Sequence, residues 1–243
     1  MRRTERVWLA LFGFVLLLSG PRCEAPGGPA GPSPSSKPLA ASVDTPAATP
    51  TPEISAVSGS FDGCPAEGTA FAVQVKHLNE LKNRGNDPTD ADIDHSVTLA
   101  AVLASGDDQA RWDATKAAEI EAYVVNVKPG GKETTNCAAT DLPHEDTHIE
   151  LVLGPSDSAK SRRVIVEVTP RWRAAMQAQG VDWSTDQLKA SIEGHWVKVR
   201  GWLFFDAQHK GQSENTAPGK PGDWRATAWE IHPVTSIQVV PGP

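Results

Sequence analysis

Residues 146–153, Asp-Thr-His-Ile-Glu-Leu-Val-Leu, alternate between two kinds of side chain. Successive side chains of a β-strand point to opposite faces, so the pattern predicts a strand with an apolar face formed by Thr147, Ile149, Leu151 and Leu153. The other face, formed by Asp146, His148 and Glu150, sets an imidazole between two carboxylates. Such a grouping can bind a cation, hold a catalytic proton or make salt bridges. We expect the strand to lie in a small barrel.

Further strands are predicted on both sides of this one. In residues 120–128 the apolar face switches from Ala122 and Val124 to Val125 and Val127, which is typical of a bulge in a barrel strand. Residues 162–168 and 196–205 are the next two strands, and the second contains Gly201, where barrel strands often bend. Extended segments are also predicted at 224–232 and 234–240.

Two helices are predicted between residues 168 and 196. Thr169 and Pro170 supply an N-cap and a first-turn proline, and Gly180 suits the stop of this helix. The residues Ser184-Thr185-Asp186-Gln187 fit a capping box that begins a second helix, which ends at Gly194. For residues 71–81 the spacing of apolar residues fits both a strand and a helix.

Three strands, a helical insertion and further strands form the element order of an OB-fold. Residues 119–243 resemble this five-stranded Greek-key barrel, with helices between its third and fourth strands. We therefore predict a mainly β fold in which residues 59–118 form a small N-terminal α/β extension packed on the barrel. A different small barrel is the alternative.

Four segments also resemble an uncharacterised group of exported bacterial proteins. They are DTHIEL at 146–151, VEVTPR at 166–171, GWLFFD at 201–206 and WEIHPV at 229–234. The resemblance implies the boundaries of a mature domain and carries no activity.

The N-terminus has the form of an export signal. Arg2, Arg3 and Arg6 precede an apolar run over residues 7–18, and small residues follow, so residues 1–25 are expected to be a signal peptide. Residues 26–58 are rich in Pro, Ala and Ser and are expected to be a disordered tether. Cys23 is a candidate lipidation site; cleavage near Ala25 and retention as an anchor are the alternatives. We expect a protein of the periplasm, cell envelope or extracellular space.

The two remaining cysteines, Cys64 and Cys137, are a disulfide candidate in an exported chain. The crosslink would close a loop of roughly 70 residues and contribute about 4 kcal/mol to the free energy of unfolding on the chain-entropy model. Two separate buried thiols are the alternative.

Several ionisable residues suit a divalent metal such as zinc. The candidate ligands are Asp146, His148, His209 and His232, with Glu150 or Glu230 as the general base of a metal-dependent hydrolase. In a nuclease version, phosphate would be held by Arg171, Arg173 and Arg225. The alternative is that these residues form salt bridges on solvated strand faces, because structural networks also gather ionisable groups.

Composition favours a binding role. Trp202 and Trp224 are the tryptophans expected to be exposed, where they could stack on a sugar or a base; anchoring of the core is the alternative. The formal net charge of −7 disfavours nucleic acid without excluding a local basic patch. We therefore expect a non-catalytic envelope module that binds an oligosaccharide or a protein, with a metal-dependent hydrolase as the alternative.

Overall fold

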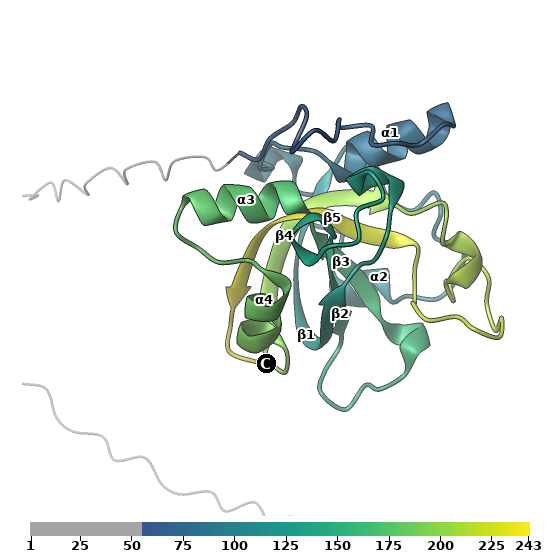
Figure 1. The fold of residues 1–243 in the computed structure, drawn as a ribbon. Helices are drawn as coiled ribbons and strands as arrows, with labels where there is room; N and C mark the ends of the chain where they lie inside the picture. Colours follow the sequence, from purple (N-terminus) through teal and green to yellow (C-terminus); the bar gives the residue numbers. More distant parts are fainter. Residues whose placement is uncertain (1–54) are drawn as a thin grey trace, which may run out of the picture. The chain divides into compact units, whose positions relative to one another are not determined.

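The structure is a computed structural model and describes residues 55–243 (Figure 1). The expected signal peptide, Cys23 and the expected tether up to residue 54 lie outside the described residues. No helix among the described residues is long and apolar enough to cross a membrane.

Five strands close into a barrel in the order β1-β2-β3-β5-β4. The pairing of β3 with β5 is parallel, and the other neighbours are antiparallel. Two helices, α3 (Pro170–Ala178) and α4 (Thr185–Ile192), lie between β3 and β4 in the chain. This confirms the predicted OB-fold-like barrel with its helical insertion. The strands are β1 (Ala117–Pro129), β2 (Thr147–Val152), β3 (Val164–Val168), β4 (Trp196–Phe205) and β5 (Trp229–Val239).

The interior of the barrel is built from one face of each strand, as the alternation predicts, except that Leu153 lies just beyond β2 and is exposed. Ile149 and Leu151 of β2 are fully buried beside Val166 of β3, and Val199 of β4 completes this part of the core. The opposite face of β2 is also buried, since none of its six residues is exposed to solvent. Other parts of the chain must therefore cover the ionisable face.

Two irregularities fit the strands to the barrel. The register of β1 against β2 shifts between Val124 and Asn126, and Val124 and Val127 both face the core, which confirms the predicted bulge. The register of β4 against β5 shifts on both sides of Gly201. A Cβ atom at this position would lie 2.2 Å from the carbonyl oxygen of Pro233, so only glycine lets the two strands approach.

The helices begin at the predicted caps. The Thr169 side chain accepts a hydrogen bond from the backbone N–H of Trp172, and Ser184 accepts one from that of Gln187. Gly180 follows α3 with φ of 78°, a left-handed conformation that glycine adopts readily. Figure 1 shows α4 beside the barrel, where it contacts β1.

Residues 59–116 contribute two helices, α1 (Val73–Lys82) and α2 (Leu99–Val102). The ambiguous segment 71–81 is therefore largely helical. Leu99 and Val102 join the main core, and the Arg84 guanidinium donates to the carbonyl oxygens of Leu203 and His232. Short 3-10 turns complete the described elements: η1 (Asp90–Asp92), η2 (Thr134–Asn136), η3 (Leu142–His144), η4 (Lys160–Arg162) and η5 (Lys210–Gln212).

A disulfide joins Cys64 to Cys137, with Cα atoms 5.8 Å apart. The predicted pairing is confirmed. The bond ties the segment before α1 to the loop between β1 and β2, and that loop forms one wall of the pocket described next.

Candidate functional site

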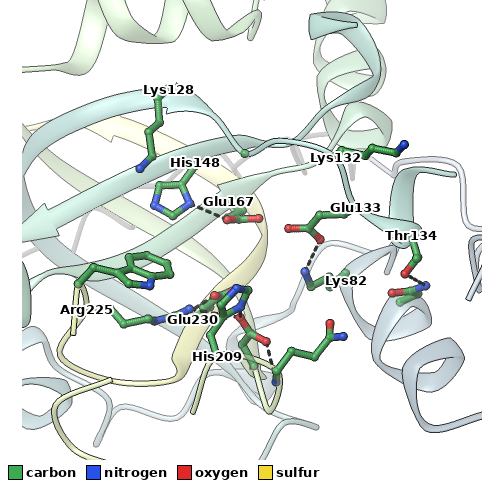
Figure 2. Close-up of a pocket in the computed structure, with 15 residues that line it drawn as sticks. Lys82, Lys128, Lys132, Glu133, Thr134, His148, Glu167, His209, Arg225 and Glu230 are labelled. Atoms are coloured by element: carbon green, nitrogen blue, oxygen red, sulfur yellow. Dashed lines mark hydrogen bonds and ion pairs between the residues drawn. The ribbon is translucent and has the colours of Figure 1, made fainter. Parts of the chain in front are cut away.

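A pocket of about 530 Å³ opens over the ionisable face of β2, β3 and β5 (Figure 2). The end of α1, the loop after β1 and the segment between β4 and β5 form its walls. These three segments explain why the outer face is buried. The side chains at its floor and far wall include His148, Glu167, Asp206, His209, Trp224 and Glu230.

Strand pairing brings the central residues of this pocket together. His148 of β2 lies opposite Glu167 of β3, and Glu230 of β5 lies opposite Ile165 of β3. Figure 2 shows the His148 ring facing Glu167, and their Nδ1 and Oε1 atoms are 2.9 Å apart. The other oxygen of Glu167, Oε2, lies 3.4 Å from Nδ1 of His232. Glu167 therefore connects the two histidines.

His148 is held between two carboxylates. Its Nε2 atom lies 3.6 Å from Oε1 of Glu150, which also accepts from Lys128 at 2.9 Å. Burial lowers the pKa of His148, but the hydrogen bonds to Glu150 and Glu167 outweigh it and raise the pKa to about 9. The same burial raises the pKa of Glu150, whereas His148, Lys128 and Arg163 lower it to about 2.

Arg225 is fully buried and joins two acidic side chains. Its Nη1 atom lies 3.2 Å from Oδ2 of Asp206, and its Nη2 atom lies 2.7 Å from Oε1 of Glu230. Asp206 also contacts Nδ1 of His209, and this contact raises the pKa of the histidine. Burial raises the pKa of Asp206, but His209 and Arg225 lower it to about 2. The guanidinium is thus already occupied by two protein carboxylates.

Asp146 and His232 lie deeper than the pocket floor. Asp146 is 1% exposed, His232 is 0% exposed, and their Oδ2 and Nε2 atoms are 3.6 Å apart. Burial raises the pKa of Asp146 to about 7 although His232 lowers it. One ligand atom from each of Asp146, Glu167 and His232 lies within 4.8 Å of the others. Within residues 55–243 these form the one group of three His, Cys, Asp or Glu side chains this close.

The four predicted metal ligands therefore do not form a single site. Asp146 and His232 come together, and Glu167 takes the position beside them. His148 shares Glu167 with His232 but lies outside this group, and His209 lies against Asp206. The two predicted bases are each paired with an arginine and a histidine. Glu150 contacts Arg163 and His148. Glu230 contacts Arg225 and His232.

The two tryptophans expected to be exposed differ. Trp202 is 6% exposed, donates from Nε1 to the carbonyl oxygen of Asn86 and lies under the Arg84 guanidinium. The predicted exposure of Trp202 is wrong because the extension covers it. Trp224 is half-buried in the pocket wall, with its ring centroid 5.7 Å from that of His148.

All three arginines expected to hold phosphate have partners within the protein, and those of Arg225 are Asp206 and Glu230. Arg171 donates to the carbonyl oxygens of Val57, Gly59 and Cys64 and so holds the segment before α1. Arg173 donates to backbone oxygens of the segment before β2, including that of Glu145. Neither residue lines the pocket in Figure 2.

The pocket residues without a role in the sequence interpretation include Glu167, Lys82 and Glu133. Glu167 faces away from the valines of β3, so strand alternation could have found it. Lys82 and Glu133 form an ion pair of 2.6 Å between α1 and the loop after β1. Burial lowers the pKa of Lys82, but Glu133 and other carboxylates raise it above its usual value. No sequence pattern connects these two residues, which are 51 positions apart.

Comparisons with protein-family models, with curated proteins and with solved structures found no match to this chain. The kind of ligand that the pocket can bind is therefore inferred from the residues that line it. Its walls offer paired acids and bases, an indole and open space, which together suit a polar ligand that accepts and donates hydrogen bonds.

Proposed function

We propose that this protein is an exported binding module of the cell envelope that takes an acidic oligosaccharide into the pocket beside Trp224. One observation carries the proposal. The four acidic side chains that line the pocket are each paired with a basic group, whereas cationic groups stand at its rim.

The most exposed ionisable side chains of the pocket are basic. The Lys128 side chain is 46% exposed and that of His209 is 39% exposed, whereas that of Glu133 is 25% exposed and that of Glu230 only 3%. Lys132 is also exposed, and Figure 2 shows it at the edge of the pocket. An entering ligand meets these cations before the buried carboxylates, so a negatively charged ligand is favoured at the pocket of an otherwise acidic protein.

Size and composition favour a saccharide. Pockets that hold small ligands have volumes of about 300–1,000 Å³, and this pocket is within that range. The indole of Trp224 provides an aromatic surface beside polar groups, which is the combination that a sugar ring requires. Nucleic acid is disfavoured because a polynucleotide needs a continuous basic face, and the formal net charge of the chain is −7.

Binding is better supported than hydrolysis. A general base must be able to accept a proton from a bound water or substrate. Glu150 is held by Lys128, Arg163 and His148, and Glu230 by Arg225 and His232. Neither predicted base is free to do so, and Glu150 does not line the pocket.

The exported location is part of the proposal. The disulfide between Cys64 and Cys137 supports it, since such bonds persist mainly in oxidising compartments.

The proposal is tested by titrating the wild-type protein with three probes while following tryptophan fluorescence. The probes are a galacturonate tetramer, the methyl ester of the same tetramer, and a single-stranded DNA octamer. We expect the galacturonate tetramer to change the fluorescence and the uncharged ester to bind at least about tenfold more weakly, a difference of about 1.4 kcal/mol. A response to DNA alone, or to none of the three, would reject the proposal.

A further inference from the structure

We propose that Asp146, Glu167 and His232 bind a divalent transition-metal ion beneath the pocket. This site goes beyond saccharide binding and stands on different atoms. It also differs from the ligand set expected from the sequence, because Glu167 replaces His148 and His209.

The ligand atoms are buried, close together and without hydrogen-bond partners among the described residues. Asp146 is 1% exposed and neither of its carboxylate oxygens has a hydrogen-bond partner within the described residues. The same is true of Oε2 of Glu167 and of Nε2 of His232. Buried polar atoms are normally satisfied, and a carboxylate with two unpaired oxygens is costly to bury. A cation among these atoms would satisfy all of them together.

The spacing of these atoms also suits a metal ion. Oδ2 of Asp146 lies 3.6 Å from Nε2 of His232, and one ligand atom from each of Asp146, Glu167 and His232 lies within 4.8 Å of the others. Ligand atoms at about 2.0–2.2 Å from a tetrahedral zinc ion lie about 3.3–3.6 Å apart. Small side-chain movements would therefore complete the coordination.

His232 is also held in the orientation that a metal ligand needs. Nδ1 of His232 lies 3.2 Å from Oε2 of Glu230, and Arg225 holds the other oxygen of Glu230. A metal-binding histidine characteristically donates its second ring N–H to a carboxylate, which fixes the tautomer and leaves the other nitrogen free for the metal. This arrangement assigns Nε2 as the ligand atom.

The combination of ligands indicates the class of ion. One imidazole and two carboxylates suit zinc and manganese, and their charges neutralise a divalent cation in a buried place. Glu167 lines the pocket, whereas Asp146 and His232 do not, so an ion would enter from the pocket side. With Oε2 on the metal, Oε1 of Glu167 would still accept from His148.

Calorimetric titration of metal-stripped full-length protein with Zn²⁺ and Mn²⁺ tests this site. We expect one equivalent of metal per chain and a higher melting temperature in its presence. Asp146→Asn and His232→Gln should lose this equivalent. The control His144→Gln removes an exposed histidine that pairs with Asp141 and Asp62, and it should bind metal as the wild type does. Trp224→Ala should also bind normally, which separates this result from that of the saccharide test.

Wild-type protein that binds neither ion would overturn the site and leave a buried ion-pair network. Unchanged affinity in the Asp146 and His232 variants would also overturn it. If these variants do not fold, Glu230→Gln decides the question, since it keeps every ligand and removes the carboxylate charge that supports His232 and also pairs with Arg225. We expect this variant to bind about 10- to 100-fold more weakly, and an unchanged affinity would reject the site.

Discussion

His148 and Ile149 are neighbours on β2, are both buried, and belong to opposite faces of one sheet. Ile149 lies in an apolar core, where stability comes from the removal of hydrocarbon from water. His148 lies in a network of buried charges, where the cost of desolvation offsets much of the attraction. The comparison shows that burial has two origins in this barrel. The inner face needs it for folding, and we infer that the outer face keeps its charges for binding.

Breaking the network of buried charges on the outer face of the sheet should lower the free energy of unfolding the most. Arg225→Met removes the partner of both Asp206 and Glu230 while keeping a long side chain. We expect the free energy of unfolding to fall by about 3–5 kcal/mol, because two buried carboxylates lose their counter-charge. Urea denaturation measures this change. A loss below about 1 kcal/mol would show that the carboxylates are solvated and that the network is loosely packed.

Truncating the inner face should cost slightly less. Ile149→Ala leaves a cavity in the barrel and should lower the free energy of unfolding by about 2–5 kcal/mol in the same assay. Leu153→Ala is the matched control, because this leucine follows β2 and is exposed. It should change stability by less than about 0.5 kcal/mol. Equal losses in the two variants would contradict the assignment of the inner face.

The inner face is also the part that the sequence predicts best. The bulge near Val124, the close approach at Gly201 and the cap at Thr169 each follow from a local pattern. These features depend on residues a few positions apart, and strand alternation then places the core.

Alternation also predicts which polar residues share the outer face, but not what covers it. Lys82 and Trp224 reach the site from segments without strand periodicity, and they belong to regions far from β2 in the chain. The same limit explains the error at Trp202, since the hydrogen bond of its indole goes to Asn86, 116 positions away. The pairing of distant segments is set by tertiary packing and not by local pattern.

Acid should weaken the outer network before it affects the inner face. Because the folded pKa of Asp206 is about 2, below the value of about 3.9 for an unfolded aspartate, its contribution is complete only above about pH 5. It is lost as the pH falls towards 2 and amounts to about 1–3 kcal/mol. Urea denaturation from pH 5 to pH 3 should show this decline, and Asp206→Asn should make it shallower. A slope that is the same in both proteins would contradict this role of Asp206.

Changes at the exposed edge of the pocket should alter binding more than stability. Lys128→Gln combined with Lys132→Gln removes two exposed charges, one of which pairs with the buried Glu150, and the melting temperature should fall by less than about 4 °C. The affinity for a galacturonate tetramer should fall several-fold, and its dependence on salt should become weaker. Unchanged affinity and salt dependence would show that these lysines do not face the ligand.

The most direct test compares two partly exposed tryptophans by calorimetry with a galacturonate tetramer. Trp224 lines the pocket, whereas Trp196 packs on Tyr123 outside it. We predict that Trp224→Ala weakens binding at least about tenfold, or about 1.4 kcal/mol, while Trp196→Ala binds as the wild type does. Equal affinities of the two variants and the wild type, or a loss confined to Trp196→Ala, would contradict the pocket as the binding site.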